Sequence, residues 1–155
     1  MSGVDEIDSG DPIEAVRENA RRKAEAVQGD LVLGVDTDVV LDGEILGKPR
    51  DAAHAHELLG RLSGRSHTVV SGLALVRDGH TEIANAATEV VFRDVHPILQ
   101  WYVQTGEWEG RAGGYAIQGR GAALVRSISG DYLNVVGLPV AALLDLAPDL
   151  LRAGQ

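Results

Sequence analysis

The sequence predicts an α/β fold: an elongated mixed β-sheet flanked by helices, in one domain that spans residues 1–155. Three observations predict this class. An amphipathic segment with helix-start signals lies near the N-terminus, a nearly continuous apolar run covers residues 31–41, and two Asp-Gly pairs separate runs rich in β-branched residues. Helices and strands that alternate in this way favour helices packed on a common sheet.

The first helix is predicted to begin after Asp11, an N-cap residue followed by Pro12 at the first helical position and by Glu14 as a capping-box partner. Lys23 is expected at the border between core and solvent, because it directly precedes the apolar stripe of this helix. The residues of that stripe recur at helical spacing: Ile13, Val16, Ala20, Ala24 and Val27.

The run LVLGVDTDVVL, residues 31–41, is typical of a strand that is buried on both faces. Asp36 and Asp38 share one face of an ideal strand, and Thr37 lies on the other. An ionised carboxylate in a buried strand costs several kcal/mol unless it is paired, hydrogen-bonded or bound to metal. Asp36 must therefore have a structural partner or a function, and its buried context favours a function.

The later elements follow from turn and cap signals. Asp42-Gly43 predicts a tight hairpin, and Asp78-Gly79 predicts a long antiparallel hairpin that joins residues 67–76 to residues 80–92. Helices are expected over residues 51–62, with Asp51 as the cap, over residues 97–105 and over residues 140–151. Residues 122–128 read as a further strand.

Composition and charge exclude several classes of protein. A formal net charge of −9 opposes binding to nucleic acid or to an anionic membrane, because both depend on clustered Lys and Arg. No apolar run approaches the roughly 20 residues needed to span a bilayer, so a soluble, cytoplasmic protein without a membrane partner is expected. The chain has no cysteine, which excludes disulfides and Cys-ligated zinc.

Familiar catalytic signatures are absent. The segment GEILGKP lacks Walker spacing and has a proline where a helix should begin, and GRGAAL lacks the third glycine of a dinucleotide-binding fingerprint. No GxSxG or HExxH sequence supports a serine hydrolase or a zinc protease.

An acidic strand, two lysines and a glycine-rich segment remain. Lys23 and Lys48 are the only lysines, and Gln118 lies within EGRAGGYAIQGRGA, residues 109–122. These residues suit a metal-assisted displacement on a phosphate compound, in which a carboxylate holds a divalent cation or accepts a proton from water. A ligand-binding module without chemistry would show nearly the same residues.

Four segments in series resemble the Maf family of nucleoside triphosphate pyrophosphatases: GVDTDVVLDGEILGKP, LSGRSHTVVSGLAL, YVQTGEWEGRAGGYAIQGRGAALV and ISGDYLNVVGLPV. The resemblance covers nearly the whole chain. It implies an elongated α/β fold related to the inosine triphosphate pyrophosphatases, with the active site in a cleft. It also implies hydrolysis of a nucleoside triphosphate to the monophosphate and diphosphate, and a homodimer.

The resemblance assigns roles to single residues. Asp36 matches the catalytic aspartate of the DT motif, which accepts a proton from the attacking water. Thr37 and Gln118 match positions tied to base selectivity, and their pairing is similar to the branch that acts on dTTP and UTP. A glutamine amide can both donate to and accept from the edge of a pyrimidine base, so this preference is chemically reasonable.

The remaining matches concern the phosphates. Glu6 falls on the glutamate of the VDE motif, and Lys23 and Lys48 fall on the family's two motif lysines. The cofactor implied is a divalent cation, Mg²⁺ or Mn²⁺, for which Asp36 and Glu6 offer the best oxygen ligands.

The sequence departs from the family at its start. Members have a serine-rich S-x-S-P-R-R loop that grips the phosphates, whereas this chain opens at MSGVDE, inside the family pattern. An N-terminally truncated fold is therefore expected. Either the native protein begins upstream of Met1, or the chain is a weakened enzyme, a nucleotide-binding protein or a regulator of cell division at the septum.

The glycine-rich segment is expected to divide into two parts. Residues 110–114 form a flexible turn, and residues 115–122 form a strand edge that presents Gln118 to a base. On this interpretation, the glycines let a nucleotide approach the backbone closely.

Overall fold

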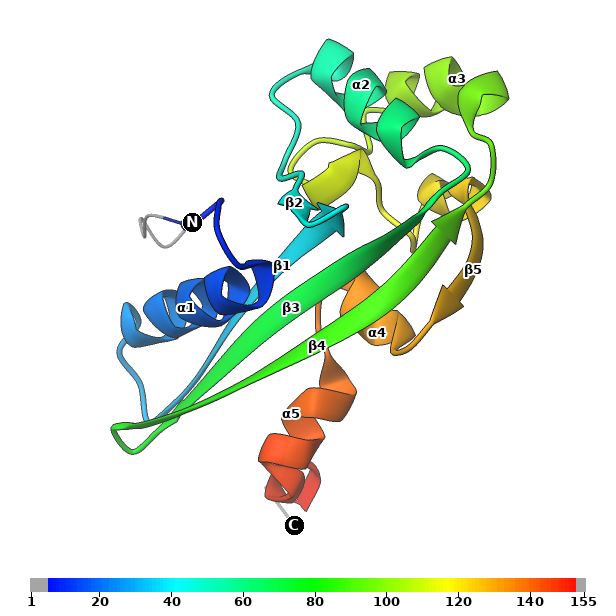
Figure 1. Cartoon of the computed structure of the whole chain (residues 1–155). Helices are drawn as coiled ribbons and strands as arrows, with labels where there is room; N and C mark the ends of the chain where they lie inside the picture. The colour runs from blue at the N-terminus through cyan, green and yellow to red at the C-terminus, as the bar shows by residue number, and fades with distance from the viewer. Residues whose placement is uncertain (1–5, 153–155) are drawn as a thin grey trace.

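The computed structural model describes residues 6–152 and has the predicted α/β class. Its five strands form one sheet in the order β2-β1-β3-β4-β5, and every described pair is antiparallel. Figure 1 shows α1 against the sheet, α2 and α3 together at one end, and α4 and α5 near β4. The strands are β1 (Leu31–Leu41), β2 (Glu44–Ile45), β3 (Ser66–Arg77), β4 (His80–Phe92) and β5 (Val125–Ser129).

The helices agree broadly with the sequence. They are α1 (Pro12–Glu25), α2 (Ala52–Leu62), α3 (Leu99–Gln104), α4 (Tyr132–Val136) and α5 (Val140–Leu146), and shorter 3-10 turns cover His96–Ile98, Ala112–Gly114, Arg120–Leu124 and Pro148–Arg152. The predicted last helix is too long, because it ends at Leu146 rather than at residue 151. Pro148 disfavours helical backbone at the residue before it, which explains the early end.

The predicted β3–β4 hairpin is confirmed and gives the sheet its elongated shape (Figure 1). Its register runs from Ser66 opposite Val91 to Arg77 opposite His80. Asp78 and Gly79 form the turn with φ of 51° and 80°, so both adopt the left-handed backbone that a two-residue hairpin requires.

β1 is paired along its length on one side only. It pairs with β3 from Leu31 to Val40, whereas β2 meets its other side only at Val40 and Leu41. Among residues 6–152, no strand pairs with the outer edge of β1 from Leu31 to Asp38.

The prediction that β1 is buried on both faces is wrong for most of the strand, because only Gly34 and Asp36 are buried on the face that α1 covers, and only Val39 and Leu41 on the opposite face. Val39 and Leu41 lie in the core, but Leu31 and Leu33 on the same face are 54% and 40% exposed. The difference arises because α4 contacts β3 and β4, and α5 contacts β4, so these helices leave the N-terminal half of β1 uncovered.

α1 packs unusually closely on the sheet because glycines face it. A Cβ on Gly34 would lie 2.4 Å from the carbonyl oxygen of Ala20, and one on Gly72 would lie 2.2 Å from that of Val16. Asp11 caps the helix as predicted, and its side chain accepts a hydrogen bond from the N–H of Ile13. Val27, predicted in the apolar stripe, instead lies beyond the end of the helix and is exposed.

The larger hydrophobic core lies at the other end of the sheet, under α2 and α3. Asp51 caps α2 by accepting from the N–H of His54 at 2.8 Å, as predicted. No helix within residues 6–152 combines the length and the hydropathy that crossing a membrane requires. The core includes Leu41, Leu58, Leu59, Leu62, Val90, Phe92, Leu99, Tyr102 and Leu124.

Candidate active site

Asp36 lies in the middle of β1 on the face that α1 covers, and it is 8% exposed. Its two carboxylate oxygens have different partners. Asn19 Nδ2 donates to Oδ2 at 3.0 Å, and Lys23 Nζ donates to Oδ1 at 2.9 Å. Both partners come from α1, one helical turn apart, so the close approach of α1 to the sheet brings them to the carboxylate.

Lys23 joins two carboxylates. Its Nζ lies 2.9 Å from Asp36 Oδ1 and 2.9 Å from Glu6 Oε1. Burial would lower the pKa of Lys23, but hydrogen bonds to Asp36 and Glu6 outweigh burial and raise the pKa above its ordinary value. The hydrogen bond from Lys23 lowers the pKa of Glu6, so Lys23 and Glu6 are both charged near neutral pH.

Asn19 is a site residue that the sequence reasoning missed. It is buried, and besides Asp36 it binds the backbone of Ile7: its Oδ1 accepts from the N–H at 2.7 Å, and its Nδ2 donates to the carbonyl at 2.9 Å. A polar residue four positions before Lys23 on the buried side of a helix was the available signal. Glu6, Asn19, Lys23 and Asp36 are called the acidic cluster below.

Thr37 points to the opposite face of β1 from Asp36, as predicted. Its Oγ1 lies 2.7 Å from the Oγ of Ser71, the fully buried residue directly across from it on β3. Asp38 is half-buried, and burial raises its pKa to about 6. The neighbouring charges of Asp36 and Glu6 act in the same direction.

Two adjoining cavities bring the predicted residues together. A cavity of about 480 Å³ is lined by Lys23, Asp36, Thr37, Lys48 and Gln118, among others. A second cavity of about 340 Å³ is lined by Glu6, Asp36, Thr37, Asp38 and Lys48, among others. They share Asp36, Thr37, Lys48 and Ala112, and we refer to them together as the cleft.

The glycine-rich segment departs from the prediction. Residues 115–122 do not form a strand edge, because turns and the 3-10 helix Arg120–Leu124 occupy this stretch. Gly113, with φ of 70°, donates its N–H to the carbonyl of Gly47 at 2.8 Å, and a Cβ there would lie 2.9 Å from Val39. A close approach between parts of the protein therefore requires this glycine.

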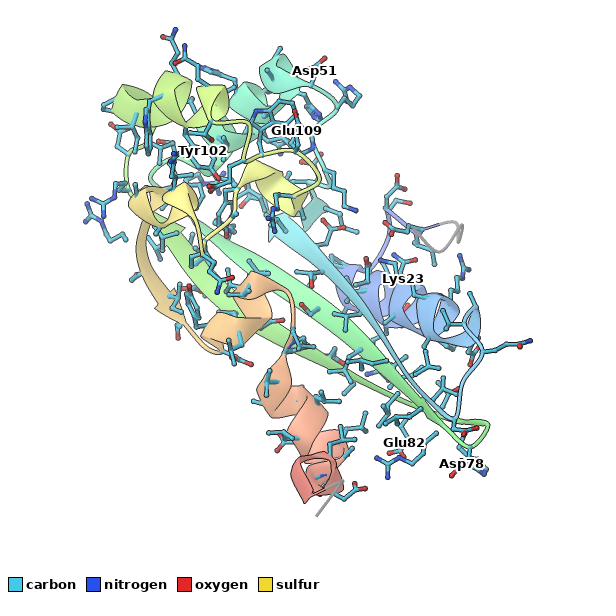
Figure 2. All side chains as sticks on the ribbon, turned by 180° about the vertical axis from the view of Figure 1, so that it is seen from behind. Lys23, Asp51, Asp78, Glu82, Tyr102 and Glu109 are labelled. Carbon is cyan, nitrogen blue, oxygen red and sulfur yellow. The ribbon has the colours of Figure 1, made fainter. Side chains whose placement is uncertain are left out.

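Glu107 is the second functional candidate that the sequence reasoning missed. It lines the larger cavity, but its carboxylate accepts from the N–H groups of Arg120 and Gly121 and from the hydroxyl of Tyr102. Figure 2 shows Tyr102 and Glu109 at the end of the molecule away from the Asp78 turn. Residues 116–121, which carry the exposed Gln118, are called the Gln118 loop below.

Candidate metal ligands are few. Within residues 6–152, no group of three or more His, Cys, Asp or Glu side chains has the arrangement of a metal site. Glu6 and Asp36 nevertheless converge, because one oxygen of each lies 2.9 Å from the same Lys23 nitrogen. Carboxylate oxygens are the ligands that Mg²⁺ and Mn²⁺ prefer, so the chemistry of these two residues fits such an ion as a partial ligand set.

Comparison with known proteins agrees with the motif series. A family model described as Maf-like protein matches residues 1–150. A protein of Symbiobacterium thermophilum named dTTP/UTP pyrophosphatase is 54% identical over 144 residues, 88% of this chain and 74% of that protein.

Two further relatives bear the same name. The Pelotomaculum thermopropionicum protein is 46% identical over 155 residues, 94% of this chain and 81% of its own length. The Pyrococcus furiosus protein is 42% identical over 147 residues, 92% of this chain and 77% of its own length. With matches that cover this much of it, the chain belongs to the Maf-like protein family.

Proposed function

We propose that this chain is a nucleoside triphosphate pyrophosphatase that hydrolyses dTTP and UTP to the monophosphate and diphosphate. The observation that carries the proposal is Asp36, a carboxylate held by Asn19 and Lys23 in a cleft that also contains Lys48 and Gln118. Relatives that share about half of the sequence or slightly less bear the name of this activity.

Asp36 is suited to accept a proton from water. Hydrogen bonds from Asn19 and Lys23 fix both oxygens and leave further acceptor positions on each. In the proposed reaction, water loses a proton to Asp36 and attacks the α-phosphorus, and the bond to the β-phosphate oxygen breaks so that diphosphate leaves. The hydrogen bond from Lys23 keeps the carboxylate oriented throughout.

The balance of charge in the cleft supports a divalent cation. Carboxylates outnumber cations among the described lining residues: Glu6, Asp8, Asp36, Asp38 and Glu107 against Lys23, Lys48 and Arg111. A triphosphate entering alone would be repelled, and Mg²⁺ or Mn²⁺ bound with it would offset that repulsion and polarise the phosphates. Asp36 and Glu6 would hold this ion, and Lys48 would contact phosphate oxygens.

Gln118 is the proposed base reader. Its side chain is exposed on the wall of the larger cavity, where its amide can donate one hydrogen bond and accept another. The 4-carbonyl and N3–H of uracil or thymine offer the complementary pair. Thr37 also lines this cavity, and its hydroxyl is paired with that of Ser71.

The test is a panel of nucleoside triphosphates assayed for diphosphate release in Mg²⁺, with Asp36→Asn as the variant. We expect dTTP and UTP to be cleaved fastest, and we expect the variant to lose about 10³-fold or more in kcat while it still binds nucleotide. Asp78→Asn, at the distant tip of the β3–β4 hairpin (Figure 2), is the matched control and should keep full activity.

Two results would overturn the proposal. One is a wild-type protein that releases diphosphate from none of the nucleotides. The other is an Asp36→Asn variant as active as Asp78→Asn. Nucleotide binding that persists without any hydrolysis would instead favour a binding or regulatory protein.

A further inference from the structure

The Gln118 loop has little regular structure of its own. The N–H of Gly119 reaches the carbonyl of Ala116 at 3.2 Å, no described strand pairs with the loop, and only its last two residues belong to a helix, the 3-10 helix Arg120–Leu124. Ile117 is the one loop side chain that lies in the hydrophobic core. A six-residue segment of this kind is mobile unless other groups hold it. The side chain of Gln118 can discriminate between bases only if the loop has a defined conformation.

Glu107 supplies acceptors for one end of the loop. Its Oε2 accepts from the N–H of Arg120 at 3.0 Å, and its Oε1 accepts from the N–H of Gly121 at 2.9 Å. Burial opposes ionisation of Glu107, but these two N–H groups and the hydroxyl of Tyr102 outweigh burial and lower its pKa. The hydrogen bonds are therefore made by a charged acceptor, which strengthens them.

Tyr102 reaches the other end of the loop. Its buried hydroxyl donates to Glu107 Oε1 at 2.8 Å and accepts from the N–H of Ala116 at 3.0 Å. Together, the carboxylate and the phenol hold three backbone N–H groups on the two sides of Gln118.

The loop and the carboxylate also fit sterically. A Cβ on Gly119 would lie 2.4 Å from Glu107 Oε2, so a larger residue next to Gln118 would displace the carboxylate. Both oxygens of Glu107 accept hydrogen bonds from the protein itself: Oε1 from Tyr102 and Gly121, and Oε2 from Arg120. This geometry distinguishes Glu107 from a group that acts on the substrate.

We propose that Glu107 and Tyr102 are positioning residues that fix the Gln118 loop and thereby set the preference for pyrimidine over purine nucleotides. The inference rests on the proposed function of Gln118 as the base reader. A loop that is already ordered loses less conformational entropy when it binds a base, and it excludes alternative poses of the amide that would suit other bases.

The experiment measures the affinity of the whole chain for dTTP and dGTP by equilibrium binding, in wild type, Glu107→Gln, Tyr102→Phe and the double variant. We expect Glu107→Gln to lower the dTTP-over-dGTP ratio about tenfold, because one acceptor oxygen is replaced by an amide donor. Tyr102→Phe should have a smaller effect, and the double variant should resemble Glu107→Gln because the two residues act as a unit. Glu109→Gln, an exposed position in the same segment, is the matched control and should leave the ratio unchanged.

Two further readouts separate positioning from general destabilisation. Amide hydrogen exchange at Arg120 and Gly121 should accelerate in Glu107→Gln, while exchange in β3 and β4 stays as in wild type. In steady-state assays with dTTP, KM should rise about tenfold while kcat changes less than threefold. If Glu107→Gln does not fold, Tyr102→Phe tests the same hydrogen-bonded unit at constant core volume.

A variant that keeps the wild-type nucleotide ratio although its loop amides exchange faster would overturn the inference. Equal losses for dTTP and dGTP would do the same. A wild-type protein without pyrophosphatase activity would overturn the proposed function. The dTTP-over-dGTP affinity ratio would still decide the present inference, because binding and hydrogen exchange are measured without turnover.

Discussion

The acidic cluster and the Gln118 loop face the same cleft, but different forces hold them. In the acidic cluster, side chains from α1 and β1 bind one another. The two elements can approach closely because the sheet has glycines, which lack a side chain, where α1 packs on it. In the Gln118 loop, the backbone is held by the carboxylate of Glu107 and by a hydroxyl in the core. The proposed chemistry therefore depends on regular elements, whereas the proposed selectivity depends on the hydrogen bonds that join Glu107 and Tyr102 to the loop.

The largest effect is expected in the core next to the Gln118 loop, at His67. His67 is buried, its Nε2 lies 2.7 Å from the hydroxyl of Tyr115, and burial lowers its pKa to about 4. Between pH 6.5 and 4, the unfolded chain binds a proton at this residue that the folded protein does not bind. The contribution of neutral His67 to the free energy of unfolding is therefore complete above pH 6.5. It decreases as the pH falls through this range, by about 3 kcal/mol in total.

His67→Gln should remove that dependence, because glutamine does not titrate. Urea unfolding at pH 7 and at pH 4 measures the difference between the two proteins. His80→Gln, at the exposed end of β4, is the control and should keep the wild-type slope. Equal pH dependence in wild type and His67→Gln would show that this histidine is not a buried neutral group.

The second test breaks the acidic cluster through its packing. A Cβ at Gly72 would lie 2.2 Å from the carbonyl of Val16, so Gly72→Ala must push α1 away from the sheet. We expect a loss of about 2 kcal/mol in the free energy of unfolding, and a loss of kcat at temperatures where the protein is still folded, since Asn19 and Lys23 move with α1.

Gly60 supplies the control for that substitution. It lies in α2, where a Cβ would meet nothing closer than a leucine methyl at 4.0 Å. Gly60→Ala should raise stability slightly, because alanine favours a helix. If Gly72→Ala unfolded at the wild-type denaturant concentration and kept full kcat, the close packing of α1 would not support the site.

The smallest expected effect belongs to Gln118. Gln118→Ala should weaken kcat/KM for dTTP and UTP about tenfold, close to 1.4 kcal/mol, with kcat nearly unchanged and the activity on purine nucleotides unaffected. Its side chain is exposed, so the melting temperature should not move. A large loss of kcat would instead place Gln118 in the chemistry and remove the contrast between the two regions.

The sequence predicted the acidic cluster better than the Gln118 loop, for physical reasons. Asp11 and Pro12 define the start of α1, and Asp36 and Asp38 interrupt an apolar run, so each of these signals is local. Glu6 was assigned to the site by the family resemblance and not by a local pattern. Asn19 was not predicted because the sequence around a helical asparagine does not reveal its hydrogen-bond partner, which here is Asp36, 17 residues away.

The loop was misread because its conformation depends on groups elsewhere in the chain. Glycines next to an aromatic residue suit a strand edge equally well, and the deciding contact comes from Glu107, 13 residues before Arg120. The packing of Gly113 on Val39 likewise cannot be predicted from the residues next to either of them in the sequence. Caps, hairpin turns and apolar spacing therefore predicted the elements, and contacts between distant residues determined the loop.

The one-sided pairing of β1 has a consequence for how the protein behaves in concentrated solution. The edge of β1 from Leu31 to Asp38, which no strand within residues 6–152 covers, lies beside two exposed leucines, and such an edge is a template for another strand and favours association. A net charge of −9 opposes that association by mutual repulsion between molecules. Because salt screens this repulsion within about 10 Å at 0.1 M, added salt should favour self-association, and dilute buffer should keep molecules apart.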